Sequence, residues 1–251
     1  LGAFAGMLAG LFGIGGGLII VPVLVLSFHA QGVAPEIITH LALGTSLPTM
    51  IFTGFSSLRA HQEAGAVDWV MIRRLGAGML IGAWLGGMTA NLLSASTLNI
   101  IIGCFAWTMA LQMGLNLRPK AERHLPGPVG TGIAGAVIGW LSALFGIGGG
   151  SMTVPYLSWN SVPMRNAVAA SAACSMPIAL AGSLSYLYAG WGHADLPEWS
   201  VGYIYLPALL GIVLTSTQFA RVGARLAHKL SPKRLKQAFA LLMLVVGAKF
   251  M

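Results

Sequence analysis

A seven-residue glycine-rich motif occurs twice in the chain. Residues 11–17 read Leu-Phe-Gly-Ile-Gly-Gly-Gly, and residues 144–150 repeat these seven letters without change. Pro22 and Pro155 follow the two copies at the same distance. The wide separation excludes a solenoid repeat and indicates an internal duplication. Each copy leaves backbone amides uncovered inside a long apolar run. A membrane tolerates such backbone only where protein or a water-filled cavity covers it.

Composition places the chain in a membrane. Of its 251 residues 56% are apolar and only 8% are charged, whereas soluble domains carry about 25% charged residues. The net charge of +8 comes from basic residues between apolar segments, which act as topology determinants rather than as a nucleic-acid surface. Cys104 and Cys174 are isolated, so neither a metal cluster nor a disulfide framework is expected. We expect no cofactor.

The apolar runs have unequal lengths. They fall at roughly 1–28, 37–58, 70–93, 97–117, 129–160, 167–190, 200–220 and 234–251. A helix over the first run would reach about 42 Å, against a hydrocarbon core of about 30 Å. The first and fifth runs both break at the glycine motif. Each is therefore either one long broken crossing or a re-entrant hairpin whose ends return to the same side.

The loop charges favour hairpins. Three loops are basic (59–74, 118–123 and 221–236), and two contain acids without Lys or Arg (29–36 and 191–199). Two hairpins put all basic loops on one face and the acidic loops on the other. The basic face is then cytoplasmic by the positive-inside rule. A hairpin plus three crossings is an odd count, so the second half is inverted relative to the first.

We therefore predict an all-α polytopic membrane protein made of two inverted repeats. Each repeat is a glycine-broken re-entrant helical hairpin plus three transmembrane helices. The predicted boundaries are an N-terminal repeat at 1–117, a basic cytoplasmic linker at 118–128 and an inverted C-terminal repeat at 129–251. The chain begins with Leu1 rather than Met and lacks a basic n-region, so we expect native residues before it and no signal peptide.

The glycine motifs are the first candidate site. A half-helix that starts after each break begins with unpaired N–H groups and about half a positive charge. Two such termini facing each other form an anion site without a buried cation. The alternative is a hinge or a close-packing contact that binds nothing. The predicted substrate-binding glycines are Gly13, Gly15, Gly16, Gly17, Gly146, Gly148, Gly149 and Gly150.

Two serines follow the breaks at matching places. Ser46 and Ser175 each precede a proline by two residues, at Pro48 and Pro177. Their hydroxyls either bind the anion or re-satisfy a carbonyl freed by the proline. His40, an ionisable group in an apolar run, is either functional or interfacial. Arg165 and Asn166 guide an anion or mark topology. The secondary candidates are His40, Thr45, Thr49, Ser151, Arg165, Asn166 and Ser171.

The positions of the Asp and Glu residues limit the mechanisms that can be expected. All six lie in or beside loops, so a proton relay built on a midplane carboxylate is not expected. No acid/base pair or metal motif supports catalysis, so we predict no catalytic residue, no metal and no enzyme. A sodium site made of carbonyls and hydroxyls stays open. An inside-negative potential of 100 mV favours anion exit by about 2.3 kcal/mol per charge, which favours export.

Glycines also mark a packing face. Gly78, Gly82 and Gly86 recur every four residues, which gives one smooth helix face that a neighbouring membrane helix can approach closely. That neighbour belongs either to the same subunit, which we favour, or to a homodimer partner.

The motif and its surroundings resemble the TauE/SafE sulfite exporter family, also called the toluene sulfonate uptake permeases. The resemblance rests on Gly6–Pro22, on its repeat Gly139–Pro155, and on a Leu-Ser pair at Leu93 and at Leu230. It covers essentially the whole chain and implies a multi-pass permease of the cell inner membrane. The implied substrate is a small sulfur oxyanion such as sulfite, or an organosulfonate. The alternative function is a membrane scaffold or partner subunit.

Overall fold

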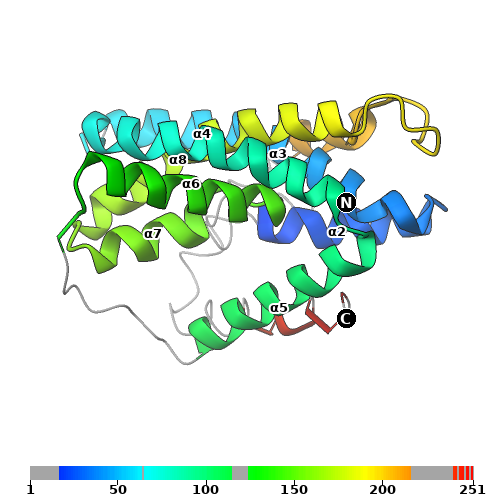
Figure 1. The fold of residues 1–251 in the computed structure, drawn as a ribbon, viewed down its shortest axis with the longest axis horizontal. Helices are drawn as coiled ribbons and strands as arrows, with labels where there is room; N and C mark the ends of the chain where they lie inside the picture. The colour runs from blue at the N-terminus through cyan, green and yellow to red at the C-terminus, as the bar shows by residue number, and fades with distance from the viewer. Residues whose placement is uncertain are drawn as a thin grey trace.

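The computed structural model describes residues 17–63, 65–114 and 124–215, together with 240–241, 243–245, 247–248 and 250. The described part is almost entirely helical (Figure 1). Its named elements are α2 (Gly17–Ala30), α3 (Pro35–Glu63), α4 (Trp69–Leu92), α5 (Ala95–Gly114), α6 (Pro128–Leu144), α7 (Gly150–Trp159), α8 (Met164–Ala189), β1 (Ser200–Val201) and β2 (Ile204–Tyr205), and a further helix spans Leu206–Thr215. Four helices are long and apolar enough to cross a membrane: α3, α4, α5 over Ala95–Gln112, and α8. The described part is thus consistent with the predicted all-α membrane protein.

Local sequence explains where the long helices begin. The side chain of Asp68 accepts hydrogen bonds from the backbone amides of Val70 and Met71, which caps α4. Ser94 caps α5 in the same way by accepting from the amide of Thr97. Such caps satisfy N–H groups that have no partner inside the helix. α6 begins at Pro128, whose missing N–H costs nothing in a first turn.

The glycine face of α4 packs against α6 of the same chain. A Cβ at Gly78 would overlap the carbonyl oxygen of Gly132, and one at Gly82 would overlap that of Ala136. On α6 a Cβ at Gly139 would come within 2.7 Å of the Cα of Met79. The expected close helix approach is therefore confirmed, and it lies inside one subunit.

Beside the glycine face, α4 presents exposed apolar side chains. Ile81 is 64% and Leu85 is 53% exposed, and on α8 Leu184 is 50% exposed. These side chains line a shallow apolar groove of about 380 Å³ between the two helices. Large apolar side chains on the outside and small ones between helices are typical of a protein surrounded by lipid.

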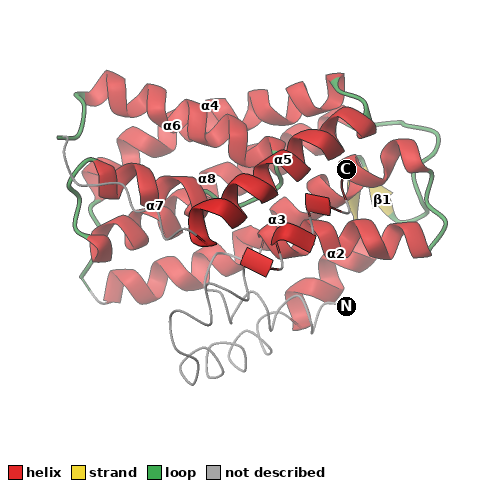
Figure 2. Ribbon diagram, turned by 90° about the horizontal axis from the view of Figure 1, so that it is seen from below, coloured by secondary structure: helices red, strands yellow, loops and turns green. Residues whose placement is uncertain are grey.

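α2 and α7 are short helices that start near the middle of the bundle and run to opposite ends of it (Figures 1 and 2). α6 runs in from one end, and after a break α7 returns to that end. Residues 128–159 therefore form a hairpin rather than a single crossing. The run at 200–220 differs from our expectation, because residues 200–205 form a two-stranded antiparallel hairpin before the helix starts.

Candidate functional site

The second glycine motif ends one helix and starts another. Gly146 has a φ of +62°, a left-handed conformation that glycine adopts without a steric penalty. The amide of Gly146 donates to the carbonyl of Ala143, and the amide of Ile147 donates to that of Ser142. This pair of bonds is a Schellman motif, which closes the C-terminus of α6. The Phe-Gly-Ile part of the motif is therefore a helix stop.

The Gly-Gly-Gly part of the motif starts α7. Gly149 stands at the N-cap position, and no side chain caps the helix there. Among the described residues no partner is found for the amides of Gly148, Gly149, Gly150 and Ser151. These N–H groups carry the positive end of the helix dipole. The start of α7 is thus able to donate hydrogen bonds to the oxygen atoms of a ligand.

The start of α2 lies against this break. A Cβ placed on Gly17 would come within 2.8 Å of the Cα of Ile147 and within 3.0 Å of the carbonyl oxygen of Gly146. The last glycine of the first motif therefore touches the centre of the second motif. Gly13, Gly15 and Gly16 lie outside the described residues.

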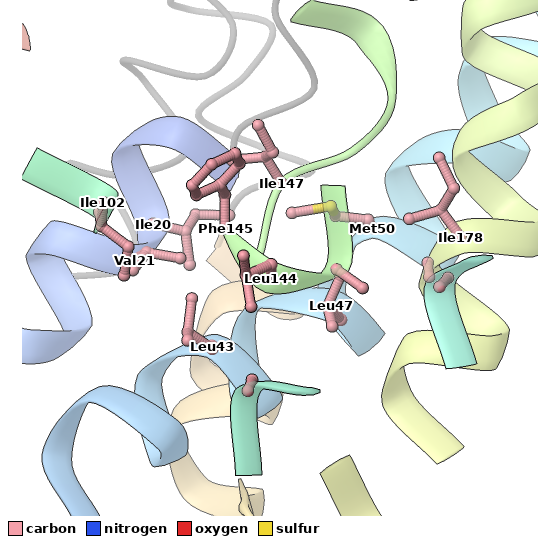
Figure 3. Close-up of a cluster of buried hydrophobic side chains, with 14 of the residues drawn as sticks. Ile20, Val21, Leu43, Leu47, Met50, Ile102, Leu144, Phe145, Ile147 and Ile178 are labelled. Atoms are coloured by element: carbon pink, nitrogen blue, oxygen red, sulfur yellow. The ribbon is translucent and has the colours of Figure 1, made fainter. Parts of the chain in front are cut away.

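A methionine fills the space between α2 and the break. A Cβ on Gly17 would overlap the terminal methyl group of Met50, and one on Gly148 would lie 3.3 Å from its sulfur. Figure 3 shows Met50 on α3 beside Ile147, with Leu47 and Leu144 below them. Met50 is 1% exposed. The start of α2 and the second break therefore both contact the flexible apolar side chain of Met50.

Ser46 and Ser175 both lie beside the break, but their contacts differ. The hydroxyl of Ser46 lies 2.8 Å from the carbonyl of Leu43 and 2.9 Å from that of Gly146, and it can donate to either. The hydroxyl of Ser175 donates to the carbonyl of Ala172 in its own helix, and its Cβ lies 3.5 Å from the Cβ position of Gly148. Neither acceptor is the carbonyl four residues before the proline.

Three of the secondary candidates have structural partners. Thr45 accepts a hydrogen bond from the amide of Tyr205 in β2, and Thr49 donates to the carbonyl of Ser46. His40 is 5% exposed, and its Nε2 lies 3.0 Å from the carbonyl of Ala90 at the end of α4. His40 is therefore buried in protein at the end of α4.

The other secondary candidates lie on α7 and α8. The hydroxyl of Ser171 is 3.3 Å from the Cβ position of Gly150, at the start of α7. The hydroxyl of Ser151 is buried and has no partner among the described residues. Arg165 and Asn166 lie in the first turn of α8, where Arg165 is exposed.

Sequence reasoning missed one residue beside the break. Thr153 is fully buried, and no hydrogen-bond partner of its hydroxyl is found among the described residues. That hydroxyl lies 3.0 Å from the Cβ position of Gly149. The aligned residue of the first copy is Ile20, so the contrast between a hydroxyl and an apolar side chain within a duplicated motif could have identified Thr153.

Charged side chains are absent from the described part of the break. His40 is the one ionisable base or acid among the buried polar residues described, and no group of three His, Cys, Asp or Glu residues suited to a metal was found there. Any ligand bound here would therefore meet peptide dipoles and hydroxyl groups.

Apolar spanning helices around a buried helix break define a multi-pass helical membrane protein. The chain belongs to the sulfite exporter TauE/SafE family, whose model matches residues 1–250. It is 37% identical to a "Probable membrane transporter protein" of Haemophilus influenzae, over 98% of this chain and 94% of that protein. Other probable membrane transporter proteins that the chain resembles occur in Methanocaldococcus jannaschii, 27% identical over 98% of this chain and 91% of that protein, and in Bacillus subtilis, 28% identical over 99% of this chain and 94% of that protein. No solved structure matches the chain. The chain is thus a membrane transporter, as the resemblance implied.

Proposed function

We propose that this protein is an inner-membrane permease that exports small sulfur-containing anions, such as sulfite or organosulfonates. The observation that carries the proposal is the start of α7, where amides without a partner in the described structure lie in a buried glycine turn that contacts Gly17. Helix N-termini bind anions through these amides and the helix dipole. The family description supports a sulfur oxyanion as the ligand.

The proposed architecture is a pair of inverted repeats. α2 and α7 run from the middle of the bundle to opposite ends (Figure 1), as a duplicated and inverted half-helix would. We assign residues 1–117 and 129–251 to the two repeats and 118–128 to a linker. Transport would proceed by alternating access of the breaks to the two faces.

Charge supports the proposed orientation. Arg73 and Arg74 lie near the start of α4, and Arg165 lies in the first turn of α8. Glu36 begins α3 at the opposite end, close to the end where the acidic loop with Asp195 lies (Figure 1). The basic end would face the cytoplasm. A monoanion would then leave down the membrane potential, which at 100 mV favours an outside-to-inside concentration ratio of about fiftyfold.

The anion would sit at the breaks. The proposed contacts are the amides of the two glycine motifs, the hydroxyls of Ser46 and Ser175, and Ser151, Thr49 and Ser171 as nearby polar groups. Met50 lies between Gly17 and Gly148, so the described conformation would be an occluded one. Methionine is unbranched and adaptable, and it can move aside at low cost.

Flux through proteoliposomes tests the proposal. Purified protein is reconstituted, loaded with sulfite or methanesulfonate, and given a potassium-diffusion potential of either sign. We expect anion efflux that follows the potential and is absent from protein-free vesicles. A lack of anion-dependent flux at either polarity would contradict the proposal. It would favour the second candidate, a membrane scaffold, because filled space at the break is also what a packing device requires.

A further inference from the structure

We infer that the hydroxyl of Thr153 is the side-chain donor that selects an oxyanion at the start of α7. Oxyanion binding would then belong mainly to the second break rather than being shared equally by the two. This inference rests on the proposed function and deepens it by naming a specificity-determining residue.

The first step is that the Thr153 hydroxyl lacks the partner that a helical threonine normally finds. Threonine in a helix usually donates to the carbonyl four residues earlier, which here belongs to Gly149. That carbonyl already accepts from the amide of Thr153 at 2.7 Å and from the amide of Met152 at 3.2 Å. The hydroxyl has no partner among the described residues although Thr153 is 0% exposed. A buried polar group left in this state is destabilising and calls for an explanation.

The second step is where the hydroxyl lies. Its oxygen is 3.0 Å from the place that a Cβ would occupy on Gly149, the N-cap residue of α7. An N-cap side chain usually supplies an oxygen atom to the first amides of a helix, and glycine cannot do so. The amides and the Thr153 hydroxyl are therefore donors without acceptors at the same helix end. A ligand with two or more acceptor oxygens satisfies both.

The third step is the difference between the two motifs. The seven residues are identical, but two of the three positions that follow differ in polarity. Leu18 and Ile20 in the first copy correspond to Ser151 and Thr153 in the second. Ile20 is 3% exposed and belongs to the apolar core (Figure 3). Of the two half-helices, α7 carries hydroxyl groups in the three residues after its glycines and α2 carries none there, so a bound oxyanion is held mainly from the α7 side.

The ligand chemistry follows from the donors. Peptide amides and hydroxyl groups donate hydrogen bonds without supplying a full positive charge, which suits a monoanion whose charge is spread over several oxygens. A sulfonate group, or sulfite in its singly protonated form, has this character.

The experiment compares two substitutions at one position. Thr153→Val has nearly the same shape and lacks only the hydroxyl, whereas Thr153→Ser keeps the hydroxyl. Each variant is reconstituted for flux of sulfite and methanesulfonate, and its melting temperature is measured in detergent with and without either anion. A hydrogen bond to a charged group contributes about 1.5–3 kcal/mol, so Thr153→Val should weaken the apparent affinity about 10- to 150-fold. Thr153→Ser should stay within a few-fold of the parent protein.

The melting temperature without a bound anion tests the inference about Thr153 independently of transport. Thr153→Val removes an unsatisfied buried donor, so its melting temperature without anion should equal or exceed that of the parent. Ser183→Ala is the matched control, because Ser183 is also buried and without a partner among the described residues. It lies two turns beyond Ser175 on α8, about 12 Å along the axis. This control should leave the affinity unchanged.

The possible results distinguish a failure of the inference about Thr153 from a failure of the proposed transport function. Unchanged affinity in Thr153→Val, with normal flux in the parent, overturns the inference and leaves the proposed function standing. Equal loss in both Thr153 variants, or a lowered melting temperature in Thr153→Val alone, assigns Thr153 a packing or structural role and also overturns it. Absence of flux and of anion-induced stabilisation in the parent protein overturns the proposed function itself.

Discussion

The hydroxyl of Ser46 lies 2.9 Å from the carbonyl oxygen of Gly146, a residue 100 positions away in the sequence. This contact joins the middle of α3, in the first half of the chain, to the helix break of the second half. Both residues are fully enclosed in protein. The break is therefore held in place by a hydrogen bond from the other half of the molecule as well as by its own turn.

Ser46→Ala should destabilise the protein more than Ser175→Ala does. Ser46 is within reach of a carbonyl of its own helix and one across the bundle, whereas the bond found for Ser175 within the described part of the chain is to the carbonyl of Ala172 in its own helix. Loss of the tertiary bond leaves the Gly146 carbonyl without this donor, at a cost of about 1–3 kcal/mol. Thermal unfolding in detergent measures the difference. Equal melting temperatures for the two variants would show that the tertiary bond adds nothing.

Gly146→Ala should be far more harmful than Gly148→Ala. The φ of Gly146 is positive, and an added Cβ would lie 2.8 Å from the hydroxyl of Ser46. The left-handed conformation alone costs about 1–2 kcal/mol for an L-residue. At Gly148 the nearest atom is the mobile sulfur of Met50, at 3.3 Å. Expression and melting temperature of the two variants should differ clearly, and similar values would contradict the role of the turn.

Met50→Ala should lower the stability of the protein and increase its sulfite flux. Removing a buried methionine side chain costs about 2–5 kcal/mol, and here the vacated volume adjoins Gly17 and Gly148. We expect faster sulfite flux from the less obstructed break. Met79→Ala is the control, since Met79 is equally buried but lies in α4, where its backbone contacts Gly139 of α6. It should lose similar stability without faster flux. Faster flux in the Met79 variant would remove Met50 from its proposed place on the path.

Gly82→Ala and Gly76→Ala should have opposite effects, although both glycines lie in α4. A Cβ at Gly82 would overlap the backbone of Ala136, and the resulting overpacking costs about 1–3 kcal/mol. At Gly76 the nearest atom is a ring carbon of Pro177 at 3.7 Å, an ordinary contact. Alanine there should gain about 0.5–1 kcal/mol of helix stability. Thermal unfolding of the two variants checks the sign of each change, and a stabilised Gly82→Ala would contradict the close approach of α4 and α6.

Short-range sequence patterns predict much of the fold. Four-residue glycine spacing identified the face of α4 that packs on α6, because helix periodicity is a local property. The glycine motif identified the interruption between α6 and α7 for the same reason. The prediction treated 200–220 as one apolar run and missed the hairpin, because strands of two residues leave almost no periodic signal and depend on partners elsewhere.

The contacts at the candidate site were harder to predict from the sequence than the fold was. The sequence aligned Ser46 with Ser175 and could not tell that Ser46 alone reaches across the bundle, since its acceptor is a backbone carbonyl in the other half. Thr153 looked like an ordinary helix residue, because the loss of its usual acceptor arises only from the geometry of the Gly149 turn. Gly17 contacts the second break, and no local sequence pattern indicated that Met50 lies against both Gly17 and Gly148.

Thr45 and Ser46 are neighbours in α3, and each holds a different distant segment. The hydroxyl of Thr45 accepts a hydrogen bond from the amide of Tyr205 at 3.0 Å, while the hydroxyl of Ser46 can donate to the carbonyl of Gly146. One turn of one helix thus anchors both the short hairpin at 200–205 and the interruption that opens α7. A shortened or displaced hairpin would disturb the geometry of that interruption without touching it, so loop length at 190–205 is constrained by packing deep in the bundle.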